Sequence, residues 1–308
     1  MSRLSESARG VFVIAATPFT PDGGLDLASV DRLVDFYLGH RVHGLTLLGI
    51  MGEAQKLTAD ESLQVVRRTL SRVAGRVPVV VGVSSAGLAQ LAALAGAAMD
   101  AGAAGVMVAP AAGLRGDGAL FEYMASVFRV LDAATPVVYQ DYPQATGVYL
   151  PVPLFHRMVD AFPRLVVLKH EDAPGLAKLT QIRQEAHRDG RRRVSVLVGN
   201  GALYYPQELA RGADGAMSGF AYPEMLVEVY ERFAAGDVDA AEDVFDAYLP
   251  LLRMEHQPGV GLAVRKMLLH RRGAIASPAL RAPGARLGTE DQREIERLVG
   301  RLERRLKG

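Results

Sequence analysis

Eight short and almost continuously apolar segments recur along the chain at intervals of about thirty residues, the length of one strand-helix unit. Their valines, leucines and isoleucines follow one another without polar alternation, as in parallel strands that are covered on both faces. The segments are residues 11–15, 44–48, 78–83, 105–109, 136–140, 165–169, 195–198 and 215–218. Their number and spacing predict a parallel β-sheet.

Helical patterns fill the intervals between these segments. They cover residues 27–37, 59–73, 88–100, 120–131, 154–161, 176–186 and 202–210. The second is preceded by Thr58 and contains Glu61, a pair whose spacing is typical of a capping box at a helix start. Eight strands with intervening helices, and no dinucleotide-binding fingerprint after the first strand, favour a closed (β/α)8 TIM barrel over an open doubly wound sheet.

The chain beyond the eighth apolar segment has a different pattern. Helical patterns, an irregular stretch and a charged final helix follow one another over residues 223–235, 238–253, 261–270, 273–288 and 289–306. No further strand pattern separates them. We therefore expect a (β/α)8 barrel catalytic domain over residues 1–220 and a C-terminal helical appendix over residues 221–308.

Composition excludes several kinds of site and partner. The 308 residues include no cysteine, which rules out disulfides, thiolate metal sites and a cysteine nucleophile. The net charge is +1, so the chain lacks the broad basic field that nucleic-acid binding requires. The seven histidines show no His-Glu-x-x-His spacing, and we expect no metal site.

Targeting and membrane signals are weak as well. The apolar run at 11–16 is too short for the core of a secretion signal, and the weakly polar stretch at 91–110 is interrupted by glycines and by Asp100. We expect a cytoplasmic, soluble protein with no membrane and no nucleic-acid partner.

The end of the sixth apolar segment carries the strongest chemical signal. Lys169 closes a run of valine and leucine, and active sites of (β/α)8 barrels lie at the carboxyl ends of the strands. The lysine either leaves the strand for solvent or is a Schiff-base amine, since desolvation favours its neutral, nucleophilic form. Tyr139, near the end of the fifth segment, would lie about 5 Å from Lys169 if the registers match. It would then move protons, or else plug the barrel top.

Turns after other strands offer weaker candidates for substrate binding. Gly-Ile-Met-Gly-Glu at 49–53 can turn backbone amides toward an anion or form a plain tight turn. Asn200 lies in a Gly-Asn-Gly turn after the seventh segment, and Met217 lies at the end of the eighth. Glu171 follows the lysine either as a solvated loop charge or as a substrate contact.

These residues together resemble the dihydrodipicolinate synthase and N-acetylneuraminate lyase superfamily. The resemblance rests on Thr-Pro-Phe at 17–19, the Gly-x-x-Gly-Glu turn, Tyr139, Lys169 and the Gly-Ala-x-Ser close of the eighth segment. It implies a dimeric or tetrameric (β/α)8 barrel in which Lys169 forms an imine with a 2-keto acid and no cofactor is needed. It also implies that Tyr139 is catalytic and that the turn holding Ile50, Met51 and Gly52 binds the substrate carboxylate.

Departures from the namesake enzymes bear on the substrate. Ile50 and Met51 replace hydroxyl residues, Pro-Ala-Ala-Gly at 110–113 lacks a tyrosine, and the segment 143–147 lacks an arginine. The segments 140–141, 169–175 and 212–218 are similar to dehydratases of 2-keto-3-deoxy-pentonates.

We therefore expect a Schiff-base lyase that dehydrates or cleaves a 2-keto-3-deoxy sugar acid. The alternatives are a dihydrodipicolinate synthase that condenses pyruvate with an aldehyde, a non-catalytic keto-acid sensor and a metal-dependent aldolase.

Overall fold

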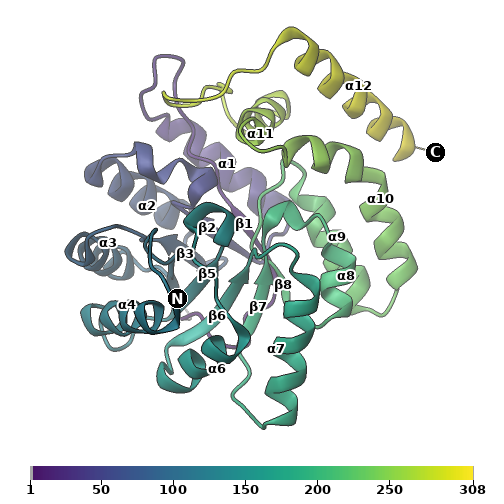
Figure 1. The fold of residues 1–308 in the computed structure, drawn as a ribbon. Coiled ribbons are helices and arrows are strands. Elements are labelled where there is room, and N and C mark those ends of the chain that lie inside the picture. Colours follow the sequence, from purple (N-terminus) through teal and green to yellow (C-terminus); the bar gives the residue numbers. More distant parts are fainter. Residues whose placement is uncertain (1–2, 308) are drawn as a thin grey trace.

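The computed structural model describes residues 3–307 and contains one closed barrel of eight parallel strands in chain order (Figure 1). The strands are β1 Gly10–Ile14, β2 Gly44–Leu47, β3 Val79–Gly82, β4 Gly105–Val108, β5 Val137–Asp141, β6 Leu165–His170, β7 Ser195–Val198 and β8 Gly215–Ala216. The predicted (β/α)8 barrel is confirmed. All eight carboxyl ends therefore meet at one rim.

Alternating side chains of the strands form two separate hydrophobic layers. On β1, Val11 and Val13 pack outward against the helices, whereas Phe12 and Ile14 point into the barrel. The interior cluster consists of Leu4, Phe12, Ile14, Val80, Ala104, Met107, Val138, Val166, Val167, Leu197 and Met217. Because both layers are apolar, the strand sequences show no polar alternation.

The helices around the barrel largely match their predicted ranges. They are α1 Leu27–Gly39, α2 Ala59–Val73, α3 Leu88–Asp100, α4 Asp117–Val130, α6 Val152–Ala161, α7 Leu176–Arg188 and α8 Tyr205–Ala210. The predicted capping box of α2 is present: the Thr58 side chain accepts from the amide of Glu61, whose carboxylate accepts from the amide of Thr58.

Short helices that the sequence did not predict follow three strands at the rim. They are η1 Ile50–Gly52 and η2 Ala54–Lys56 after β2, α5 Pro143–Thr146 after β5, and η3 Asn200–Ala202 after β7. The start of the predicted helix at 202–210 is thus a separate 3-10 turn. These turns hold the backbone close to the mouth of the barrel.

Four helices follow β8: α9 Pro223–Ala234, α10 Val238–Glu255, α11 Gly261–Arg271 and α12 Thr289–Arg305. α9 packs against β1 and α8, and thereby takes the place of the eighth barrel helix. α10 packs on α9, and α11 and α12 pack on α10 at one edge of the barrel (Figure 1). The helical appendix therefore begins after α9 in the structure, whereas the sequence placed its start at residue 221.

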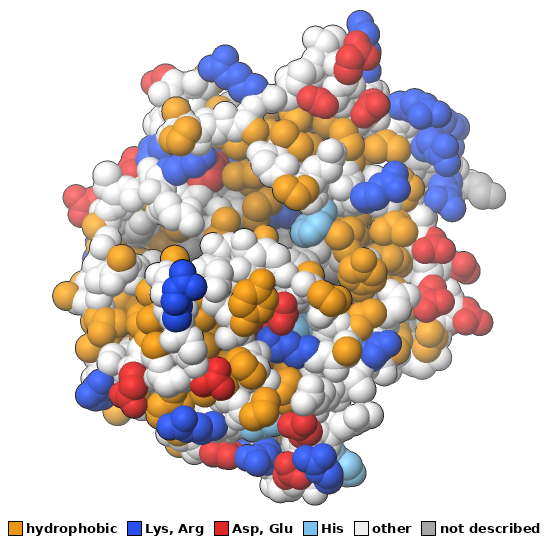
Figure 2. Space-filling model, viewed as in Figure 1, with side chains coloured by type: hydrophobic (Ala, Val, Ile, Leu, Met, Phe, Trp, Pro, Cys, Tyr) orange, Lys and Arg blue, Asp and Glu red, His pale blue; other side chains and the backbone are white. Residues whose placement is uncertain are grey.

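Charge on the surface is mixed. Figure 2 shows basic side chains gathered at the C-terminal end of α12 and acidic side chains gathered on α10 below them. None of the helices within residues 3–307 combines the length and the apolar character needed to cross a bilayer.

Candidate active site

Lys169 points into the barrel near its carboxyl rim. On β6, Val167 belongs to the interior cluster and Leu168 to the outer layer, so alternation turns Lys169 inward. The residue is only 4% exposed, and its Nζ lies 3.0 Å from Oε2 of Glu171. A buried amine thus faces a carboxylate inside the barrel, where Lys169 is positioned as the sequence predicted.

Tyr139 does not lie beside Lys169, so the predicted tyrosine-lysine pair is wrong. The register of β5 and β6 sets Tyr139 opposite Leu168 and sets Gln140 opposite Lys169. The tyrosine ring belongs to the outer hydrophobic layer, and its hydroxyl has no hydrogen-bond partner within residues 3–307. Burial, with a smaller contribution from Asp141, raises the pKa of Tyr139 well above its usual range. The phenol is therefore on the far side of the strand from the lysine.

A bulge in β6 decides this arrangement. Val137 pairs with Leu165 and the next residue, Val138, pairs with Val167, so Val166 has no partner on β5. Val166 and Val167 both belong to the interior cluster. Leu165 faces outward, and uninterrupted alternation from it would also turn Lys169 outward. The extra residue reverses that parity, as bulges near active sites commonly do.

Gln140 is the site residue that sequence reasoning missed. It is 3% exposed, and its Nε2 donates to Oε2 of Glu171 at 2.6 Å, the same oxygen that faces Lys169. Alternation from Val138 places Gln140 on the inner face, but the apolar run of β5 does not indicate which of its two faces points inward. The amide orients the carboxylate toward the amine.

Glu171 and Asn200, both predicted contacts, are brought together with Lys169. Asn200 donates from its backbone amide to Oε1 of Glu171 at 3.4 Å and from Nδ2 to the Glu171 carbonyl at 2.6 Å. Gly199 makes room for this contact, because a Cβ there would lie 2.2 Å from Cγ of Glu171. Glu171 is thus a buried, fully oriented carboxylate and not a solvated loop charge.

The turn after β2 lies at the same rim, and the backbone amide and carbonyl of its Gly52 have partners within the protein. The Gly52 amide donates to the Gly49 carbonyl at 2.9 Å, and the Gly52 carbonyl accepts from the Thr17 hydroxyl at 2.5 Å. Met51 packs against the interior cluster, and Ile50 is 38% exposed. The amides of Ile50 and Met51 open the 3-10 turn, where intrahelical partners are lacking.

Two further residues complete the surroundings. Met217 is fully buried in the interior cluster, and its amide donates to the Val198 carbonyl at 2.8 Å, so only its side chain can border a ligand. Glu53, 2% exposed, anchors the β2 turn to the appendix through Lys266, whose Nζ lies 2.5 Å from Oε1.

A cavity of about 590 Å³ opens at the rim beside these residues. Its wall includes Gln140, Met107, Ile50, Gly49, Ser84 and Gln90, from the ends of β2 to β5 and from α3. This size is within the usual range for small-molecule sites. Gln140 connects the cavity to the Lys169–Glu171 pair. Within residues 3–307, no cluster of three or more His, Cys, Asp or Glu is arranged to hold a metal ion.

Comparison with known proteins agrees with this architecture. Residues 7–302 match the dihydrodipicolinate synthetase family. The L-2-keto-3-deoxyarabonate dehydratase of Azospirillum brasilense is 34% identical over 96% of this chain and 94% of the dehydratase. The 4-hydroxy-tetrahydrodipicolinate synthase of Sorangium cellulosum is 33% identical over 99% of both chains. The crystal structure of dihydrodipicolinate synthase from Rhodopseudomonas palustris, 44% identical, superposes with a TM-score of 0.95 and covers 98% of this chain and 100% of that one. The chain belongs to the dihydrodipicolinate synthetase family, whose members are lyases.

Proposed function

We propose that this lyase dehydrates a 2-keto-3-deoxy sugar acid through an imine on Lys169. The observation that carries the proposal is the 3.0 Å contact between Lys169 Nζ and Glu171 Oε2 inside the barrel, next to its apolar interior cluster. The amine is a nucleophile for a carbonyl carbon, and the carboxylate is a base within reach of the adjacent carbon. Similarity to the Azospirillum dehydratase supports the choice of dehydration.

The reaction follows from these two groups. Lys169 passes a proton to Glu171 and attacks C2 of the keto acid with its neutral amine. Glu171 returns that proton to the departing C2 oxygen, and loss of water leaves a protonated imine that withdraws electrons from C3. Glu171 removes a C3 proton, and the C–H electron pair forms the enamine. The enamine then expels the C4 hydroxyl, which leaves as water with the proton that Glu171 carried. Hydrolysis of the unsaturated imine restores Lys169 and frees the unsaturated keto acid, which becomes the semialdehyde when protons shift from C5 to C3 and C4 and the C5 hydroxyl becomes a carbonyl.

Gln140 and Asn200 support this base. Gln140 donates to one carboxylate oxygen of Glu171 and the Asn200 amide donates to the other, so the side chain cannot rotate away from the amine. The Ile50 and Met51 amides would receive the substrate carboxylate at the opposite side of the rim. No metal or organic cofactor is needed in this scheme, because the protonated imine is the electron acceptor.

Trapping of the imine tests the proposal. Borohydride added with pyruvate or with a 2-keto-3-deoxy sugar acid is expected to attach one substrate mass, located on Lys169 by peptide mapping. A coupled assay then distinguishes a semialdehyde product from released pyruvate. The absence of an adduct with every 2-keto acid tried would overturn the imine mechanism, and adduct formation without turnover would identify a keto-acid sensor.

The alternative is a synthase that condenses pyruvate with an aldehyde. Similarity to the Sorangium and Rhodopseudomonas synthases favours it. The outward position of Tyr139 and the apolar Ile50 and Met51 weigh against it, because they leave no hydroxyl relay at these positions. Consumption of pyruvate only when an aldehyde is added would support the synthase.

We also propose that the protein acts as a dimer or tetramer. The large apolar side chains Tyr149 and Tyr204 are 67% and 59% exposed, as expected for residues covered by another subunit. Light scattering after size-exclusion chromatography gives the mass directly, and a monomer mass of 33.0 kDa would contradict this proposal.

A further inference from the structure

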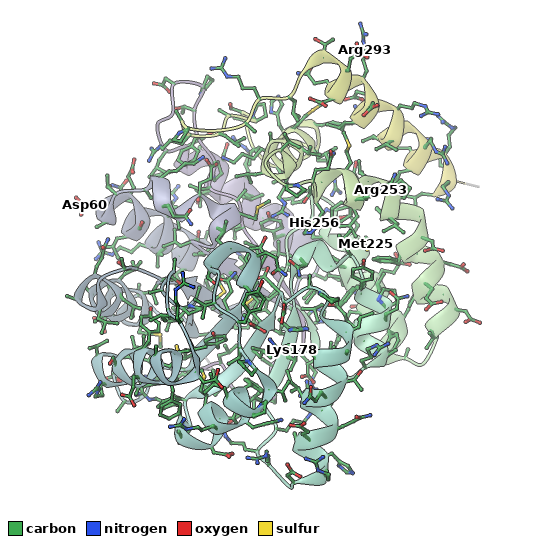
Figure 3. The ribbon with its side chains drawn as sticks, in the orientation of Figure 1. Asp60, Lys178, Met225, Arg253, His256 and Arg293 are labelled. Carbon is green, nitrogen blue, oxygen red and sulfur yellow. The ribbon has the colours of Figure 1, made fainter. Side chains whose placement is uncertain are left out.

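His256, at the end of α10, is brought from the appendix to the mouth of the barrel. Figure 3 shows it near the centre of the view. Its ring packs on Gly201 in the turn after β7: a Cβ on that glycine would lie 2.7 Å from the histidine Nδ1. Gly201 directly follows Asn200, whose amide and side chain hold Glu171. His256 therefore rests on the turn that orients the proposed catalytic base.

Electrostatics agree with that placement. Burial is the largest influence on His256 and lowers its pKa, Arg265 lowers it further, and the charge of Glu171 acts in the opposite direction. Among the described residues these are the two charged groups that influence the imidazole, one from α11 and one that directly follows β6. Because its pKa is lowered, the His256 ring is mainly neutral at the pH at which an ordinary histidine titrates. One ring nitrogen then donates a hydrogen bond and the other accepts one.

The ring nitrogens of His256 have no hydrogen-bond or ion-pair partner among the described residues. Within residues 3–307, partners lie within hydrogen-bond or ion-pair distance of the ring nitrogens of His40, His43, His156, His170 and His270. The exposed His187 and the half-buried His256 have none there. A half-buried imidazole at a barrel mouth, with both nitrogens unused, has hydrogen-bonding capacity available for a ligand.

A buried ion pair holds this side chain in place. Glu255, the preceding residue, is 2% exposed and pairs with Arg265 of α11. Glu255 also accepts from the Ala221 amide at 3.0 Å, and Arg265 donates to the Gly219 carbonyl at 2.6 Å. The end of α10 is thereby tied to the loop after β8. The imidazole is preorganised, which reduces the entropy lost on ligand binding.

We propose that His256 is a specificity residue that hydrogen-bonds a hydroxyl of the substrate beyond C3. The inference rests on the proposed function, in which Lys169 on β6 holds C2 and the β2 turn holds the carboxylate. The turn after β7 neighbours Lys169, because β7 pairs with β6 and Asn200 contacts Glu171, so carbons that extend to this side of the lysine meet His256. A hydroxyl both donates and accepts, as does the neutral imidazole. Pyruvate has no carbon beyond C3 and cannot use this contact.

Substrates of different length distinguish a role of His256 in substrate specificity from a role in imine formation. His256→Ala is expected to raise KM for a 2-keto-3-deoxy sugar acid by about tenfold, the loss of one hydrogen bond, while the rate of borohydride trapping with pyruvate stays within about twofold. His256→Asn, which keeps a donor and an acceptor, should recover part of the KM. His187→Ala is the control for a histidine outside the site. Thermal unfolding of each variant shows whether the fold is retained.

Other results contradict either the specificity role of His256 or the proposed function. An unchanged KM, or an equal loss with pyruvate and with the sugar acid in both His256 variants, overturns the specificity role and leaves the imine mechanism standing. No adduct in the unsubstituted protein overturns the proposed function, and the role of His256 with it.

Discussion

Gln140 and Lys169 lie opposite each other on β5 and β6, with both side chains directed into the barrel. Their outer neighbours, Tyr139 and Leu168, form the next pair and point toward the helices. Gln140 donates to the same oxygen of Glu171 that faces Lys169 at 3.0 Å. The amine of Lys169, the carboxylate of Glu171 and the amide of Gln140 thus form one unit inside the barrel.

Lys169→Arg is expected to abolish the borohydride adduct and to lower kcat/KM by about a thousandfold or more, because guanidinium keeps the charge opposite Glu171 but cannot form the imine. Intact-mass and kinetic measurements check both effects. Lys178→Arg, which retains a cation beside Asp141 on the outer face, is the matched control. An adduct of the same mass on the Lys169→Arg protein would show that another amine reacts.

Glu171→Gln is expected to retain the adduct with pyruvate while lowering kcat roughly a hundred- to ten-thousandfold, since an amide cannot accept the C3 proton. Exchange of the pyruvate methyl protons in D2O, followed by NMR, reports that step directly. Exchange at the unsubstituted rate would assign the proton transfer to another group. Glu185→Gln, on α7, controls for loss of a carboxylate elsewhere.

Gly199→Ala is expected to lower kcat by about a hundredfold, because the new Cβ would lie 2.2 Å from Cγ of Glu171 and must displace the carboxylate. Gly96→Ala is the control, because the added methyl group has room there. Gly96 lies inside α3, where an added Cβ would meet no other described part of the chain within 4 Å apart from its own helix backbone. Gly96→Ala should therefore leave kcat unchanged and raise the free energy of unfolding by about 0.5–1 kcal/mol. Equal kcat values in the two variants would contradict the crowding argument.

Glu208 should make the stability depend on pH. Burial raises its pKa from 4.5 to about 7, a change that nearby His170 opposes. Between these two values the folded chain holds a proton that the unfolded chain has released, so stability falls as the pH rises through this window. This loss of stability is complete above about pH 7 and absent below pH 4.5.

Glu208→Gln removes this titration. It is expected to stabilise the protein by up to about 3 kcal/mol at pH 8, relative to its effect at pH 4.5. Urea unfolding at several pH values measures the difference, and Glu294→Gln, an exposed carboxylate on α12, is the control. Parallel stability curves for Glu208→Gln and the unsubstituted protein would disprove the assignment.

Local sequence was sufficient for much of the architecture. The eight apolar segments, α2 with its Thr58–Glu61 capping box, and the family resemblance are all confirmed. Each depends on residues close together in the chain, or on a repeated pattern that a parallel sheet covered on both faces requires. The same proximity explains why Lys169 could be placed near the end of its strand.

Only the tertiary structure decided which side chains share the site. The bulge at Val166 determines that Lys169 faces inward and lies opposite Gln140, and a one-residue change of register cannot be read from apolar runs in which either face is hydrophobic. Asn200 reaches Glu171, and His256 reaches the neighbouring Gly201, from distant segments, through the closure of the barrel and the buried Glu255–Arg265 pair. The sequence thus determined the barrel and its lysine, whereas strand register and long-range packing determined what surrounds that lysine.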